Sequence, residues 1–166
     1  MTLEIPTAVT AEEQDFLTEL AAGQFVYEAG ALLGASTVAL ARSASFVISV
    51  DPHDGYPRRD PSPTWARFHH NLRKAGVDSR VQPVRATFQD APPAAAYGLA
   101  FADLTGEYDL TAEFLKKTAH LPMVAVHDYQ RSGCTGATRA VDEAIRKYKP
   151  RAVTRVGMLI LLEYGR

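Results

Sequence analysis

The chain has 166 residues, 46% of them apolar and 22% charged, and this composition is ordinary for one globular domain over residues 1–166. Its formal net charge of −1 argues against a protein that binds nucleic acid mainly through the phosphates. No stretch approaches the ~18 uninterrupted apolar residues that a membrane span needs, and the single cysteine, Cys134, fits a reducing, cytoplasmic compartment.

The first predicted elements are a helix, a strand and a second helix. Thr10 and Glu13 stand three residues apart and predict a capping box at the start of the first helix. The run at 24–29 is rich in β-branched and aromatic residues, which predicts a buried strand. A second helix is expected at about 35–43.

A glycine turn joins this strand to the second helix. Glu28 ends the strand, and Gly30 and Gly34 punctuate the turn. Ser36 and Thr37 follow, where their hydroxyls can cap the helix. A glycine lets the backbone approach a ligand closely, and free N–H groups at a helix N-terminus suit an anion. Strand, glycine turn and helix therefore predict the first half of a nucleotide-binding βαβ unit.

The spacing of the turn distinguishes between nucleotide ligands. A dinucleotide fingerprint needs three glycines as G-x-G-x-x-G, and the third is missing here. The pattern E-x-G-x-x-x-G from Glu28 to Gly34 resembles motif I of class I S-adenosylmethionine-dependent methyltransferases, above all the small-molecule O-methyltransferase branch. Taken alone, the turn also fits an ordinary strand–turn–helix of any α/β domain.

The second predicted strand, 46–50, ends at Asp51, about 20 residues after the glycine turn. An acid at this position binds ribose hydroxyls in nucleotide-binding folds, because a carboxylate can accept from two hydroxyls at once. The alternative is that Asp51 is a cap or turn residue before Pro52. The spacing from Gly30 favours the ribose role.

A helix at about 62–75 and a third strand at 81–86 come next. In the O-methyltransferases the residues just past the third strand flank the adenine. The resemblance therefore implies that Phe88 stacks on adenine and that Gln89, or Asp90 beside it, meets the exocyclic amine. A helix cap and one buried aromatic ring are the alternative.

The resemblance becomes more specific along the next two strands. The strand at 97–102 ends at Asp103, and the strand at 123–126 ends in the sequence His127–Tyr129. One branch of the class I methyltransferases has the same series, with a strand ending in aspartate and a later strand ending in His-Asp-Tyr or His-Asp-Trp. The match runs in order over roughly residues 10–145.

This resemblance implies a metal-assisted chemistry at Asp103 and Asp128. In metal-dependent O-methyltransferases carboxylates at these positions hold Mg²⁺, which lowers the pKa of the substrate hydroxyl. The family's usual Asp-Gly-Asp-His turn reads Asp103-Leu104-Thr105-Gly106 here, so the second acid and the histidine are absent, as is the lysine base of some relatives. We therefore expect weak or absent Mg²⁺ binding in the free protein.

The general base also has to be found elsewhere. His127, followed by Asp128, is the best candidate, since an unperturbed imidazole titrates near neutrality. The alternatives are a buried histidine hydrogen-bonded at the strand end and an aspartate that caps the next turn.

A helix at about 135–148 and two closing strands, 151–155 and 157–163, complete the chain. The resemblance implies an α/β fold with a doubly wound, mostly parallel sheet, the Rossmann-like methyltransferase fold, and an antiparallel closing strand. The expected activity is methyl transfer from S-adenosylmethionine to an oxygen of a small molecule, with a homo-oligomer left open. The alternatives are a catalytically degenerate methyltransferase-like protein that binds the cofactor or a partner, and another nucleotide-dependent α/β enzyme. Open α/β sheets bind ligands at strand ends, and the candidate ligand-binding residues there are Glu28, Gly30, Gly34, Ser36, Asp51, Phe88, Gln89, Asp103, His127 and Asp128.

Overall fold

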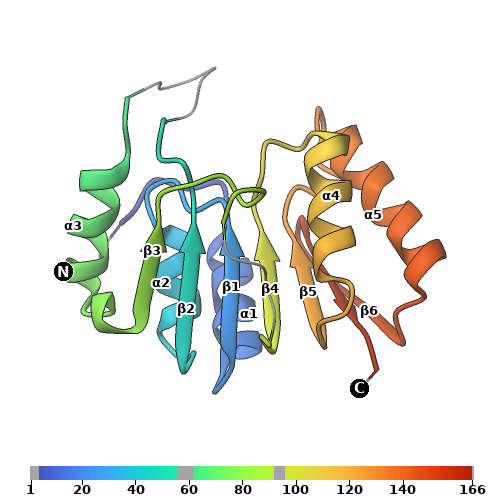
Figure 1. Cartoon of the computed structure of the whole chain (residues 1–166), viewed down its shortest axis with the longest axis horizontal. Coiled ribbons are helices and arrows are strands. Elements are labelled where there is room, and N and C mark those ends of the chain that lie inside the picture. The colour runs from blue at the N-terminus through green and yellow to red at the C-terminus, as the bar shows by residue number, and fades with distance from the viewer. Residues whose placement is uncertain (1–3, 56–61, 92–95, 166) are drawn as a thin grey trace.

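The computed structural model describes residues 4–55, 62–91 and 96–165. Its strands form a single sheet of seven strands (Figure 1). They are β1 (Phe25–Ala29), β2 (Phe46–Val50), β3 (Val81–Val84), β4 (Leu99–Ala102), β5 (Met123–Val126), β6 (Ala152–Val156) and β7 (Leu159–Glu163). The order across the sheet is β3-β2-β1-β4-β5-β7-β6.

Helices cover both faces of this sheet. They are α1 (Ala11–Ala21), α2 (Ala35–Ala41), α3 (Trp65–Ala75), α4 (Tyr108–Thr118) and α5 (Thr135–Tyr148). One core cluster joins residues of α1, α2 and α3 to one face, and a second joins α4 and α5 to the other face. Figure 1 shows α4 and α5 in front of the sheet, with α1 and α2 behind it. This is the doubly wound α/β arrangement that the sequence predicted.

The pairing of the strands also confirms the predicted topology. The first five strands run parallel, with β1 between β2 and β4. The strand β7 runs antiparallel to both β5 and β6, so it is the expected antiparallel closing strand. The chain order reverses between β1 and β4, and open sheets of this kind bind ligands at the carboxyl ends of the strands beside such a switch point.

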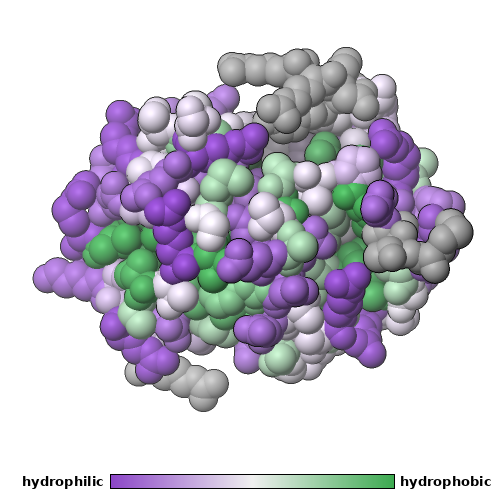
Figure 2. Space-filling view, turned by 180° about the vertical axis from the view of Figure 1, so that it is seen from behind, coloured by the Kyte–Doolittle hydropathy of each residue, from purple (hydrophilic) through white to green (hydrophobic). Residues whose placement is uncertain are grey.

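Burial explains why these segments form strands and helices. All four residues of β4 are buried, as in a parallel strand covered on both faces. All seven residues of α2 are buried too, because this helix packs on the sheet and contacts both α1 and α3. The hydroxyl of Thr18 on α1 donates to the carbonyl of Ala39 on α2 at 2.9 Å. Seen from behind, hydrophilic residues surround hydrophobic ones that gather toward the middle of the face (Figure 2).

Most predicted bounds agree with the observed ones to within a few residues. The capping box of Thr10 and Glu13 is present at the start of α1. The prediction that Ser36 and Thr37 cap the second helix is wrong, because the N-cap is Gly34 and both hydroxyl residues lie inside α2. Within the described residues, none of the helices has the length and hydropathy that crossing a membrane requires.

Candidate active site at the carboxyl ends of the strands

The carboxyl ends of β1, β2, β4 and β5 form an edge, here termed the strand-end rim. Glu28 lies just below this rim, at the end of β1, and is fully buried. Its carboxylate accepts hydrogen bonds from Ser36 at 2.7 Å, Thr37 at 2.6 Å and Ser49 at 2.6 Å. Burial raises the pKa of Glu28 to about 7, although the three hydroxyl donors act in the opposite direction. Glu28 and Ser36 therefore fasten α2 to the sheet, and the cofactor contacts expected of them stay a prediction.

The glycine turn passes close to β4. Gly30 has a φ of +88°, and a Cβ atom on it would lie 2.1 Å from the main-chain oxygen of Asp103. Gly34 has a φ of +90°, and its Cβ would lie 3.0 Å from the ring of Phe68 on α3. At both positions a larger residue would be strained by the left-handed backbone and would also collide with a close neighbour. The close approach expected of Gly30 is thus made to the protein's own β4 strand end.

Asp51 lies at the predicted place, directly after β2, with 14% of its side chain exposed. One carboxylate oxygen accepts from the N–H groups of Ala31 and Leu32 in the glycine turn, at 2.8 and 2.9 Å. The other accepts from the N–H group of His53 at 2.6 Å. A carboxylate offers about four acceptor positions, so roughly one remains for a ligand. Asp51 therefore shapes the turn and can accept from one ribose hydroxyl.

Phe88 and Gln89 are turned toward α4. The Phe88 ring is 7% exposed and meets the ring of Phe114 edge-on, with centroids 5.8 Å apart. The Gln89 amide donates to Glu113 at 3.2 Å. Both line a cavity of about 270 Å³. The sheet contributes Tyr27 to its wall, two positions before the end of β1. These contacts fit the alternative of a buried aromatic ring better than the predicted adenine contacts.

A cluster of ionisable groups forms where β4 and β5 end. The ring of His127 is fully buried, and its Nδ1 atom lies 3.3 Å from an oxygen of Asp103 and 3.3 Å from an oxygen of Asp128. Its Nε2 atom lies 3.4 Å from an oxygen of Glu13 on α1. Asp103 is the most exposed member, with 26% of its side chain accessible. Three carboxylates therefore surround one imidazole.

The charges of this cluster decide its protonation. Burial alone lowers the pKa of His127, but the carboxylates of Asp103 and Asp128 outweigh burial and raise the pKa to about 10. Such an imidazole is already protonated at neutral pH and cannot accept a proton. The prediction of His127 as general base therefore conflicts with this arrangement, and the alternative of a buried histidine bonded at the strand end describes it better.

Asp128 is held by two further partners from the loop that follows it. Arg131 donates to one of its oxygens at 2.7 Å, and the thiol of Cys134 lies 3.6 Å from the other. Burial raises the pKa of Asp128, but its contacts with His127 and Arg131 give a net lowering. Asp128 is thus a carboxylate that stays ionised beside a candidate acceptor site.

Glu13 is the site residue that the sequence did not indicate beyond its capping role. Its carboxylate is fully buried and accepts from the N–H groups of Thr10 at 2.7 Å and Met158 at 2.6 Å. Burial raises the pKa of Glu13, but these backbone donors and the charge of His127 outweigh it and lower the pKa. Glu13 and His127 are 114 positions apart in the chain, so only the capping-box pattern marked Glu13 in advance.

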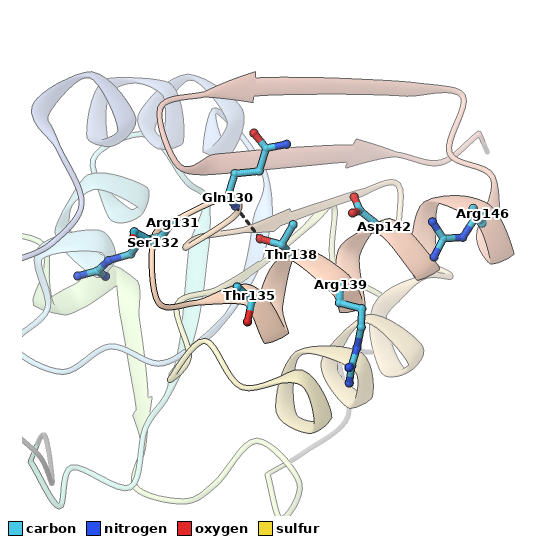
Figure 3. Close-up of a pocket in the computed structure, with 8 residues that line it drawn as sticks. All are labelled: Gln130, Arg131, Ser132, Thr135, Thr138, Arg139, Asp142 and Arg146. Atoms are coloured by element: carbon cyan, nitrogen blue, oxygen red, sulfur yellow. Dashed lines mark hydrogen bonds between the residues drawn. The ribbon is translucent and has the colours of Figure 1, made fainter.

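An open hollow of about 500 Å³ shares Arg131 with the surroundings of this cluster and runs along α5 from its first turn to its last. Figure 3 shows its eight lining residues, Gln130, Arg131, Ser132, Thr135, Thr138, Arg139, Asp142 and Arg146. The side chains of Arg131, Arg139 and Arg146 point in different directions, so they do not converge on one anionic group (Figure 3).

Comparisons with known proteins agree with the fold. No family model and no curated protein matches the sequence. Rv0187 from MTB, solved with its cofactor, has 21% identity and a TM-score of 0.75, and the match covers 96% of this chain and 83% of that one. The O-methyltransferase TomG from Streptomyces achromogenes, solved with S-adenosylmethionine, has 21% identity and a TM-score of 0.66, with 95% and 82% covered. A candidate rRNA-methylase from Clostridium thermocellum has 16% identity and a TM-score of 0.69, with 97% and 99% covered. The chain therefore has the Rossmann-like methyltransferase fold, which is shared by proteins that differ in their acceptors.

Proposed function

We propose that this protein transfers a methyl group from S-adenosylmethionine to an oxygen of a small molecule. The observation that carries the proposal is the arrangement of Gly30, Asp51 and Asp103 at the switch point between β1 and β4. The fold is that of Rv0187, which was solved with its cofactor, and of TomG, which was solved with S-adenosylmethionine. The bound cofactor supplies an electrophilic methyl group.

The residues of β1 and β2 are suited to hold the cofactor. Asp51 keeps roughly one acceptor position for a ribose hydroxyl, while its other positions fix the glycine turn. Glu28 acts beneath the turn, where it anchors α2 through Ser36 and Thr37. The turn is therefore preorganised by the protein before any ligand binds.

The residues of β4 and β5 are suited to hold the acceptor. Asp103 is partly exposed and can accept a hydrogen bond from an acceptor hydroxyl. The protonated ring of His127 and the guanidinium of Arg131 place positive charge beside the aspartates, which favours an ionised acceptor oxygen. We expect Mg²⁺ to bind weakly to the free protein, because only two carboxylates converge and each already faces a cation.

A second function remains supported by one observation. The aspartates are neutralised from within by His127 and Arg131, and the family's extra acid after Asp103 is missing. A protein that binds the cofactor without catalysing transfer would also show this arrangement.

Calorimetry of the purified protein tests the first step. S-adenosylmethionine and its demethylated product should each bind with one site, and a nicotinamide dinucleotide should not. Failure of both sulfur-containing ligands to bind would refute the proposal, as would preferential binding of the dinucleotide. Transfer of labelled methyl groups to a panel of hydroxyl compounds then separates an enzyme from a binding protein that has lost catalysis.

A further inference from the structure

The connection from β3 to β4 differs from the other crossovers between parallel strands. Helices α2, α3 and α4 lie in the crossovers from β1 to β2, from β2 to β3 and from β4 to β5, whereas the described residues between β3 and β4, 85–91 and 96–98, contain no helix. In a doubly wound fold such helices cover the faces of the sheet. At this crossover the sheet instead borders the cavity of about 270 Å³, which lies between β1, the segment 88–91 and α4.

This cavity, here termed the crossover cavity, has aromatic walls. The rings of Tyr27, Phe88 and Phe114 line it, and Phe88 meets Phe114 edge-on. On its solvent side the exposed ammonium of Lys117 lies 3.4 Å from a carboxylate oxygen of Glu113. Because this pair is neutral as a whole, the cavity suits an uncharged aromatic molecule better than an ion.

The hydroxyl of Tyr27 is the polar group of this wall that lacks a partner. Tyr27 is only 3% exposed, and none of the described residues forms a hydrogen bond with its hydroxyl. The other hydroxyl of the wall, on Thr118, donates to the carbonyl of Phe114 at 2.8 Å. Burial raises the pKa of Tyr27 to about 12, so its hydroxyl stays protonated and can donate. Polar groups of nearly buried side chains are normally paired, so the occupant of the cavity is expected to supply an acceptor.

We propose that the crossover cavity is a second binding site, separate from the strand-end rim, for an uncharged aromatic molecule of one or two rings that carries an acceptor oxygen. The three aromatic side chains contact its rings, and the Tyr27 hydroxyl donates to its oxygen. An apolar cavity of about 150 Å³ holds one benzene ring, so about 270 Å³ suits one or two rings. The proposal does not rest on the proposed function, because Tyr27 lies two positions before the end of β1 and below the rim.

The test compares two probes, 1-indanone and indane, which share a bicyclic frame and differ by one carbonyl oxygen. Calorimetry of the full chain should show one site for 1-indanone. Tyr27→Phe should weaken 1-indanone binding about 5–10-fold, the effect of one lost hydrogen bond, and should leave indane binding unchanged. Tyr97→Phe is the matched control, since that ring lies 5.8 Å from Tyr27 but outside the cavity lining; it should change neither affinity.

The variant should also fold, because it removes a hydroxyl that the described residues leave unpaired, and its melting temperature should be unchanged or higher. If it does not fold, Ala91→Leu decides, because the larger side chain fills the wall and should weaken both probes at least about fivefold.

Three results would overturn the proposal. The first is no binding of 1-indanone at millimolar concentration, and the second is an equal effect of Tyr27→Phe, or no effect of Ala91→Leu, on both probes. The third is displacement of 1-indanone by the demethylated product of S-adenosylmethionine, which would make the cavity part of the cofactor site. Binding of 1-indanone by a protein that does not bind S-adenosylmethionine would refute only the proposed function and would support this site.

Discussion

The two halves of the strand-end rim hold their carboxylates with different kinds of partner. On the β1–β2 side, the described donors to Glu28 and Asp51 are neutral hydroxyl and N–H groups. On the β4–β5 side, Asp103 and Asp128 face the charged groups of His127 and Arg131. Burial raises the pKa of Glu28 to about 7. The contacts with His127 and Arg131 instead lower the pKa of Asp128.

The β1–β2 side, with Glu28 and Asp51, is here termed the scaffold half. The β4–β5 side, with Asp103 and Asp128, is termed the electrostatic half, because its carboxylates are paired with charged groups. Neutral donors fix the geometry of the glycine turn but do not compensate the charge of a buried acid fully. In the other half, the cationic partners His127 and Arg131 lower the pKa of Asp128 and keep it ionised. The following predictions test whether the first half is structural and the second electrostatic, in order of decreasing effect.

The largest effect is expected from Gly30→Ala. The added Cβ meets the main-chain oxygen of Asp103 at 2.1 Å, and the φ of +88° is unfavourable for alanine. We expect the free energy of unfolding to fall by more than about 3 kcal/mol, because backbone strain and a core clash combine. Urea denaturation measures the change. Gly133→Ala is the matched control, since its φ is +85° and the described residues leave its Cβ clear to 4 Å; it should cost only about 1–2 kcal/mol. Equal losses would show that the approach to β4 does not matter.

The next effect concerns the buried acid of the scaffold half. Glu28→Gln should lower the free energy of unfolding at neutral pH by about 1–3 kcal/mol, because the amide cannot accept from all three hydroxyls. Since the folded-state pKa of Glu28 is raised to about 7 from an ordinary 4.5, the folded protein binds more protons between these values. The stability of the wild type relative to the variant should therefore fall as pH rises from about 4.5 to about 7, and then level off. A difference that grows with pH in this window would contradict the assignment.

The third prediction concerns His127 in the electrostatic half, whose contribution to the free energy of unfolding should change over a different pH range. The folded-state pKa of His127 is raised to about 10 from an ordinary 6.5, so its contribution to stability is fully present below 6.5 and is lost as pH rises through about 10. Relative to His127→Gln, the wild type should lose more than about 1 kcal/mol of unfolding free energy over this range. Thermal or urea unfolding at several pH values provides the measurement. A difference that stays constant would mean that His127 is not held as a cation.

The smallest effect is expected for cofactor affinity. Asp51→Asn should weaken S-adenosylmethionine binding by about 1 kcal/mol, roughly fivefold, because one hydrogen bond to a charged acceptor becomes a neutral one. Calorimetry on the folded variant gives the value. Asp54→Asn is the matched control, since that side chain is 77% exposed and lies 3.8 Å from Arg85 at the surface. Identical affinities for the wild type and Asp51→Asn would remove Asp51 from the ribose site.

The sequence by itself determined the elements and the places where strands end. The strand at 123–126 and the helix at 135–148 were predicted with their observed bounds, because apolar runs and helical periodicity act over neighbouring residues. The capping box at Thr10 was predicted for the same reason. The resemblance supplied the doubly wound, mostly parallel sheet with its antiparallel closing strand, which no local pattern contains.

Only the tertiary structure decided which groups face one another. Glu28 meets Ser49 from the adjacent strand, and Glu13 meets His127 across 114 positions of sequence. The same packing turned Phe88 into the core and protonated the histidine that the sequence offered as a base. The reason is physical: hydrogen bonding within a turn depends on nearby residues, whereas burial and the pKa of a side chain depend on every charge and donor that folding brings around it.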